Sequence, residues 1–187
     1  CITFSSNEIH LYAVKNMIVI VEGCDKAGKT TLAQTLAARV DLIYYHATIS
    51  VETNLFEKYV DIIRSINRPT IADRFYPSEL VYGPLIRGHS RLSISQFRNL
   101  NKMIQIQGGC FIYCFANRSI ITDRFTSEKE NYLPISLIPE TLRNYKRIIA
   151  VARENLPVFT YNSGLSQNAS SLRIEELVSL LQKKIAT

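Results

Sequence analysis

Long hydrophobic runs are missing from this 187-residue chain, although 47% of its residues are hydrophobic. No segment approaches the roughly 20 apolar residues of a transmembrane helix, so we expect no membrane partner. The first residues, 1–16, also lack the basic start and the apolar core of a signal peptide. They precede the first expected strand and form an extension of unassigned role. We therefore expect a globular, cytoplasmic protein.

Spacings typical of metal sites are lacking as well. The chain has no C-x-x-C pair, and its histidines are too dispersed for an obvious metal centre. The cysteines are Cys1, Cys24, Cys110 and Cys114, and the histidines are His10, His46 and His89. This distribution fits a protein that works in a reducing compartment.

Runs of like charge are short. The formal net charge is +6, from 22 Lys and Arg against 16 Asp and Glu, but the longest basic run is the pair Lys183 and Lys184. Scattered basic residues favour small anionic partners over nucleic acid. No repeat, low-complexity tract or linker divides the chain, so we expect one domain over 17–187.

The most informative stretch is 23–31, GCDKAGKTT, which satisfies G-x-x-x-x-G-K-[ST] directly after an apolar run that begins at Met17. In this pattern, backbone N–H groups of a glycine-rich turn converge on phosphate oxygens, at the positive end of the following helix. Lys29 is expected to reach the β- and γ-phosphates of ATP, and the Thr30 hydroxyl to ligate Mg²⁺. Gly23, Asp25, Ala27, Gly28 and Thr31 complete the expected loop contacts with ATP.

Cys24 lies inside this loop. One interpretation is a reactive thiol whose modification would block the site, and the other is a small side chain that fills the loop. The sequence favours the second interpretation without excluding the first.

Apolar runs alternate with helical patterns along the chain, which is typical of a parallel α/β sheet covered on both faces. The expected strands occupy 17–21, 42–47, 69–75, 108–116 and 157–161, and the expected helices 31–40, 51–66, 78–88, 94–107, 117–125, 139–156 and about 170 onward. Ligands of such sheets bind outside the carboxyl ends of the strands. Residues 22–31, His46, Asp73, Arg74 and Asn117 are therefore expected to converge on one crevice.

Two charges, Asp73 and Arg74, follow the buried run TIA of the third expected strand. An unpaired charge there would be costly. An arginine fork beside a phosphate loop suits bidentate binding of a second phosphate, whereas Asp73 suits a water on Mg²⁺ or the orientation of that arginine. The structural alternative is an Asp–Arg ion pair that closes the strand end.

The sequence resembles the thymidylate kinase branch of the P-loop nucleoside monophosphate kinases, including compact phage-type members, from Met17 to about Tyr161. The resemblance rests on EGCDKAGKTT in the first loop, DRFYPSELVYG from Asp73 and, more weakly, E-x-Y-L at 130–133. It implies a three-layer α/β/α fold with a five-stranded parallel sheet and a short lid at about 126–133. It also implies Mg²⁺-dependent transfer of a phosphoryl group from ATP to a deoxynucleoside monophosphate, with dTMP favoured.

The resemblance assigns roles around the acceptor. Asp25 matches a carboxylate that meets the 3′-hydroxyl of the sugar, and Arg74 matches the arginine that holds the acceptor phosphate. Tyr82 matches an aromatic residue that lies under the deoxyribose and crowds a 2′-hydroxyl. Ser78 belongs to the same acceptor set, and Phe56 would stack on the base or else belong to the core.

The resemblance also assigns roles around the donor. Lys29 and Thr30 match the phosphate and magnesium residues of the family, and Asp73, because its carboxylate suits a water on Mg²⁺, completes the expected metal pair. Lys26 stands where some members carry an arginine that contacts the transferring phosphate. Arg118 or Arg124 would stack on adenine or enter from the lid.

One departure leaves the base of the acceptor open. Members that read thymine often carry an arginine four residues after the stacking phenylalanine, but here Val60 follows Phe56 at that spacing. The assignment of dTMP therefore depends on the resemblance and not on a base contact that the sequence identifies.

Two other classes of function stay open. The first is a deoxynucleoside kinase or another small-molecule P-loop kinase, which commonly carries a carboxylate base after the second strand. In this chain no acid lies between the second expected strand and Glu52. A nucleotide-binding regulatory module or a GTP switch is the other class. A GTP switch carries N-K-x-D at the end of a strand, and the most similar segment, 101–104, lacks the aspartate. The oligomeric state is open too, with a homodimer as one option.

Overall fold

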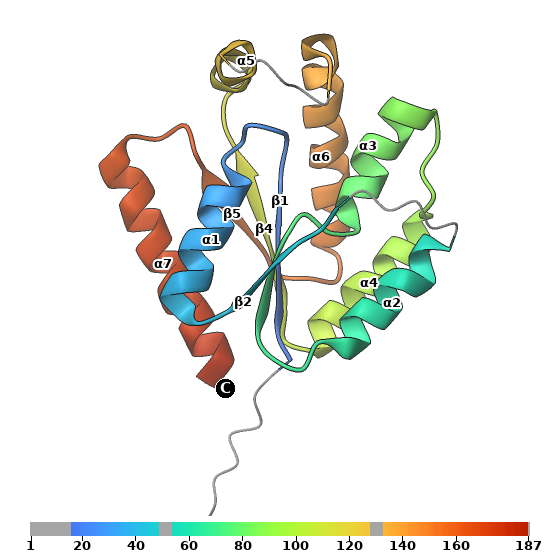
Figure 1. The fold of residues 1–187 in the computed structure, drawn as a ribbon, viewed down its shortest axis with the longest axis vertical. Helices are drawn as coiled ribbons and strands as arrows, with labels where there is room; N and C mark the ends of the chain where they lie inside the picture. Colours follow the sequence, from blue (N-terminus) through green and yellow to red (C-terminus); the bar gives the residue numbers. More distant parts are fainter. Residues whose placement is uncertain (1–15, 49–53, 128–132, 187) are drawn as a thin grey trace, which may run out of the picture.

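The computed structural model describes residues 16–48, 54–127 and 133–186. In these ranges the chain forms a five-stranded sheet between two layers of helices (Figure 1). The strands are β1 (Ile18–Glu22), β2 (Ile43–His46), β3 (Thr70–Asp73), β4 (Cys110–Phe115) and β5 (Val158–Asn162). The helices are α1 (Lys29–Val40), α2 (Leu55–Ser65), α3 (Pro77–Arg87), α4 (Ile94–Ile106), α5 (Arg118–Thr126), α6 (Ile138–Ala152) and α7 (Gln167–Ala186).

The predicted fold class is confirmed, since all strand pairs are parallel and the order is β2-β3-β1-β4-β5. β1 is the central strand and the point where the chain switches from one half of the sheet to the other. Ligands bind at the carboxyl end of the strands at such a point. The register places the end of β1 beside the ends of β3 and β4, with Val21 opposite Asp73 and Glu22 opposite Tyr113.

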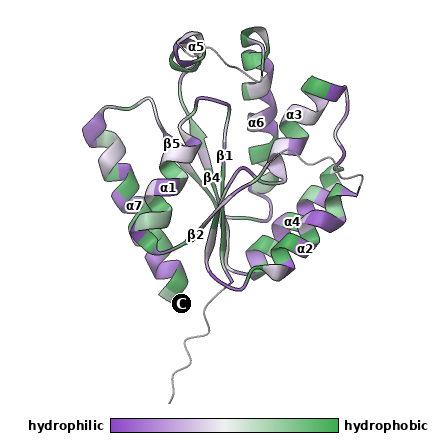
Figure 2. Cartoon of the chain, in the orientation of Figure 1, coloured by the Kyte–Doolittle hydropathy of each residue, from purple (hydrophilic) through white to green (hydrophobic). Residues whose placement is uncertain are grey.

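Helices cover both faces of the sheet. α1 and α7 pack on one face, and α2, α3, α4 and α6 pack on the other (Figure 1). The side chains of β1 alternate between the two cores, so all five residues are buried and the strand reads as one apolar run ending in an acid. Figure 2 shows that the helices carry both apolar and polar residues along their length.

Element boundaries differ from the predictions by a few residues. β3 ends at Asp73, two residues early, because Arg74 adopts a left-handed backbone conformation with φ of 65° that a strand cannot include. α4 begins at a capping box, in which the Ser93 hydroxyl accepts from the Gln96 N–H and the Gln96 side chain accepts from the Ser93 N–H. No helix in the described ranges combines the length and apolar character of a membrane span.

Two predictions fall outside the described residues. The extension at 1–16 lies there except for Asn16, and the expected lid at 126–133 lies there at 128–132. Both stay predictions.

Candidate active site

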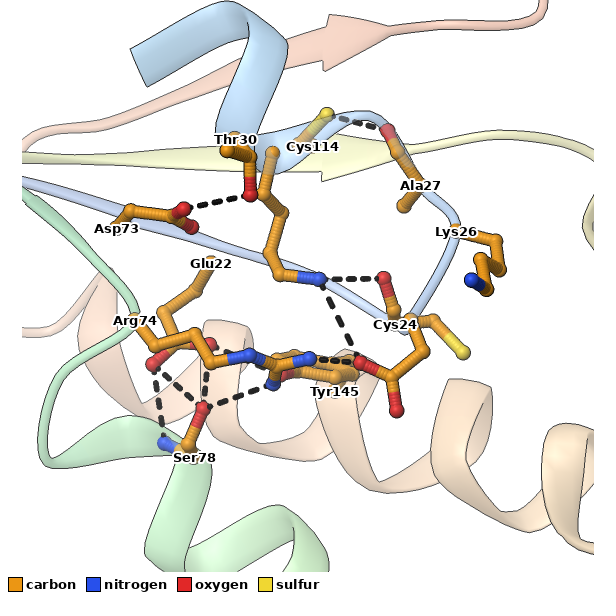
Figure 3. Close-up of polar contacts among 12 residues, drawn as sticks. Glu22, Cys24, Lys26, Ala27, Thr30, Asp73, Arg74, Ser78, Cys114 and Tyr145 are labelled. Carbon is orange, nitrogen blue, oxygen red and sulfur yellow. Dashed lines mark hydrogen bonds and ion pairs between the residues drawn. The ribbon is translucent and has the colours of Figure 1, made fainter. Parts of the chain in front are cut away.

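The glycine-rich loop joins β1 to α1 and depends on two glycines. Gly28, the residue before α1, has φ of 80°, and an added Cβ would lie 3.1 Å from Cβ of Ser163. At Gly23 an added Cβ would collide with the carbonyl oxygen of Cys114 on β4. The Cys114 thiol in turn donates to the carbonyl of Ala27 at 2.6 Å, so β4 braces the loop (Figure 3).

Lys29 opens α1 and folds back over the loop. Its Nζ donates to the carbonyl of Cys24 at 2.8 Å and lies 3.9 Å from a carboxylate oxygen of Asp25. The side chain is 5% exposed, and burial lowers its pKa against the opposing charge of Glu22. The ammonium group is thus held inside the loop, where the motif predicts phosphate oxygens.

Thr30 and Asp73 lie together, as predicted. The Thr30 hydroxyl donates to Oδ2 of Asp73 at 2.6 Å (Figure 3). Asp73 is fully buried, and its Oδ1 has no hydrogen-bond partner in the described parts of the chain. Hydroxyl and carboxylate oxygens are ligands that Mg²⁺ prefers, and a hydroxyl that donates its proton to Asp73 keeps its lone pairs available. The pair fits a magnesium ion.

Arg74 pairs with the loop and not with its neighbour Asp73. Its guanidinium forms an ion pair with Asp25 and lies over the ring of Tyr82, 5.2 Å from the ring centroid. Its Nη1 is 3.4 Å from the Ser78 hydroxyl. The interpretation of Asp73 and Arg74 as an ion pair that closes the strand end is therefore wrong. The Arg74 guanidinium faces the glycine-rich loop instead.

The structure brings four predicted acceptor residues together: Asp25, Arg74, Ser78 and Tyr82. Phe56 lies half-buried at the start of α2, where it packs against the hydrophobic core. Val60 belongs to the same core and is 6% exposed. Val60 therefore serves the core and offers no polar group to a base.

Sequence reasoning missed the part that Glu22 plays. This fully buried carboxylate accepts from the backbone N–H group of Phe75 at 2.9 Å. It also accepts from the backbone N–H group of Ser78 at 3.1 Å, from the Ser78 hydroxyl, and from the Tyr145 hydroxyl at 2.9 Å (Figure 3). It thereby places a negative charge at the start of α3 and anchors the turn that carries Arg74. The sequence signal for this role was an acid at the end of a buried strand. Its partner Tyr145 lies 123 residues away and gave no such signal.

On the side of α5 and α7, the loop borders a cavity of about 620 Å³. Lys26, Thr31 and Arg124 line it. The Arg124 guanidinium donates to the Lys26 carbonyl at 2.8 Å and to the carbonyl of Ser163 at 2.8 Å, so it joins α5 to the loop and to the turn after β5. Arg118 is exposed at the start of α5 and does not line this cavity.

Cys24 is 1% exposed, and burial raises the pKa of its thiol to about 11. The thiolate, which is the reactive form, is therefore scarce near neutral pH. These properties favour the small loop filler. We expect iodoacetamide at about pH 8 to alkylate Cys24 at least about tenfold more slowly in the native protein than in the denatured protein, as followed by peptide mass spectrometry. Equal rates would restore the reactive interpretation.

No protein-family model matches the chain, and no curated protein shows significant sequence similarity to it. Solved structures do match. The YorR protein of Bacillus subtilis, in complex with phosphorylated GDP, gives a TM-score of 0.74 at 23% identity, over 89% of this chain and 96% of that chain. Thymidylate kinase from Candida albicans gives 0.58 at 13% identity, over 90% and 93%. Deoxyadenosine kinase from M. mycoides with bound dCTP gives 0.55 at 16% identity, over 87% and 100%. At these identities the likeness establishes only the fold, which this chain shares with these proteins.

Proposed function

We propose that this protein transfers the γ-phosphoryl group of ATP to a deoxynucleoside monophosphate, with dTMP as the favoured acceptor. The observation that carries the proposal is the pair of separate cationic groups on either side of Asp25. Lys29 lies 3.9 Å from the Asp25 carboxylate within the donor loop, and Arg74 pairs with the same carboxylate from the turn after β3. Two neighbouring cationic groups suit a reaction in which the γ-phosphate of ATP and the phosphate of the acceptor are brought together.

Phosphoryl transfer needs alignment and charge neutralisation more than covalent chemistry. Lys29 and the loop amides would neutralise the donor phosphates, and Arg74 would hold the acceptor phosphate in line. Mg²⁺, held by Thr30 and Asp73, would supply charge neutralisation at the donor phosphates. A phosphate monoester, with a second pKa of about 6, is largely ionised at neutral pH and needs no strong base.

A deoxynucleoside kinase is the second candidate, favoured by the likeness to the M. mycoides deoxyadenosine kinase. A 5′-hydroxyl acceptor needs a general base. Among the described residues around the loop, Glu22 accepts from backbone and hydroxyl donors, Asp25 pairs with Arg74, and Oδ2 of Asp73 accepts from Thr30. Oδ1 of Asp73 is the atom that we assign to the metal ion. Glu52, the next acid after β2, lies outside the described residues.

The test is a coupled assay of ADP formation with dTMP, dUMP, dCMP, dAMP, dGMP and thymidine as acceptors. We expect turnover with monophosphates, highest for dTMP, and none above background with thymidine. Thymidine as the best acceptor would favour the nucleoside kinase. A preferred purine monophosphate would overturn only the assignment of the base.

Tyr82 and Asp25 lead to a prediction about the sugar. A ring beneath the sugar leaves little room for a 2′-hydroxyl, and Asp25 can accept a bond from a 3′-hydroxyl, so deoxyribose should be preferred over ribose and dideoxyribose. Tyr82→Ala is expected to relax the discrimination against ribose, and Asp25→Asn to lower activity and weaken the discrimination against dideoxyribose. Specificity constants for dTMP and its ribose counterpart measure this, and equal constants in the wild type would refute it.

A further inference from the structure

The two oxygens of the buried Asp73 carboxylate differ in their number of hydrogen-bond partners. Three groups lie within hydrogen-bond distance of Oδ2: the Thr30 hydroxyl at 2.6 Å, the Tyr44 hydroxyl at 2.9 Å and Nδ1 of His46 at 3.1 Å. Oδ1, equally buried, has no partner in the described ranges. A buried acceptor left without a donor is costly, so the asymmetry needs an explanation.

Two of the three groups come from β2, the edge strand that pairs with β3. Tyr44 and His46 are two residues apart, so their side chains point to the same face of the sheet, and His46 lies opposite Asp73 in the register. Backbone pairing already joins β2 to β3 over four residue pairs. The side-chain bonds therefore add something other than strand pairing.

These bonds set the orientation of the carboxylate. A carboxylate only accepts, so Tyr44 donates its hydroxyl proton, and the contact with His46 requires a proton on Nδ1. Both donors draw Oδ2 towards β2, and Thr30 donates to the same atom from the phosphate loop. Oδ1 is thereby left without a donor from the described residues and stays available beside the Thr30 hydroxyl.

We propose that Tyr44 and His46 are positioning residues that fix Asp73 so that its free Oδ1 serves the metal ion, directly or through a bound water. The inference rests on the proposed function, because it places the metal of the ATP complex at Thr30 and Asp73. Groups that orient a metal-binding carboxylate typically change metal affinity by about 10- to 100-fold when they are removed. Neither residue needs to touch ATP or the acceptor for this effect.

The test measures Mn²⁺ binding by electron paramagnetic resonance, with the protein saturated by the non-hydrolysable analogue adenylyl imidodiphosphate. Tyr44→Phe removes one hydrogen bond and keeps the ring, and we expect it to weaken Mn²⁺ binding by about tenfold. His46→Leu should act in the same direction. His46→Asn, whose amide can donate from nearly the position of Nδ1, should recover most of the loss. Affinity for the metal-free analogue should stay unchanged in all three variants.

Tyr45→Phe is the matched control. Tyr45 points to the other face of the sheet, where its ring packs edge-on against Phe75 with centroids 6.1 Å apart. It should leave Mn²⁺ affinity at the wild-type value. If Tyr44→Phe and His46→Leu lower Tm but bind Mn²⁺ as the wild type does, the two residues only brace the sheet and the inference is overturned. If the wild type itself binds no Mn²⁺ with the analogue, the metal site fails, and the proposed function with it.

Discussion

Lys29→Ala is expected to lower turnover by about a hundredfold or more while the chain stays folded. Lys29 places its ammonium group inside the phosphate loop, 2.8 Å from the carbonyl of Cys24, and is 5% exposed. Because the ammonium group is already in place before the reaction, it can stabilise the negative charge of the transition state without any rearrangement of the protein. Its removal should therefore act on kcat more than on the KM values.

The measurement is steady-state ADP formation, with the circular dichroism spectrum and Tm of each variant as folding checks. Lys183→Ala is the matched control, because Lys183 is an exposed lysine in the last turn of α7. It should behave as the wild type. Near-normal turnover of Lys29→Ala would contradict the P-loop kinase mechanism.

Arg74→Ala is expected to raise the KM for the monophosphate by about 10- to 100-fold and to leave the KM for ATP nearly unchanged. Hydrogen bonds to charged groups contribute about 1.5–3 kcal/mol each, and about 1.4 kcal/mol corresponds to a factor of ten. Burial disfavours the charged form of Arg74, but Tyr82, Tyr145 and Glu22 outweigh it and raise the pKa, so the guanidinium stays charged.

Arg74→Lys is the informative comparison. It keeps the charge and loses the planar fork, so its KM for the monophosphate should lie between those of the wild type and Arg74→Ala. Both variants retain a non-glycine residue at φ of 65°, so the backbone cost is the same in each. A change confined to the KM for ATP would show that Arg74 serves the donor and would reverse our assignment of the two phosphate sites.

The fold was predictable because the central strands β3, β1 and β4 are largely buried on both faces and therefore read as apolar runs. β1 is the clearest case, with all five residues buried. Boundaries were less predictable where a residue adopts an uncommon conformation. β3 ends where Arg74 adopts a left-handed backbone conformation, which residues other than glycine rarely adopt. No local sequence pattern predicts this conformation.

The candidate site was predictable where its chemistry is local in sequence. The phosphate loop is one continuous segment, so Lys29 and Thr30 follow from spacing alone. The hydrogen bonds that position the site join distant residues. Glu22 meets Tyr145, and Asp73 meets Tyr44, only after the sheet and helices have assembled. A single sequence carries no signal for such pairs, and the contact of Arg124 with Ser163 belongs to the same class.

The most direct test of the central claim is ADP formation by the wild-type protein with ATP and Mg²⁺, measured with and without dTMP and with product identification by ion-exchange chromatography. We predict that dTMP raises the rate of ADP formation well above the background and that dTDP appears in equal amount. The same rate with and without a monophosphate, with no diphosphate formed from any acceptor of the panel, would contradict the claim that this P-loop serves a nucleoside monophosphate kinase.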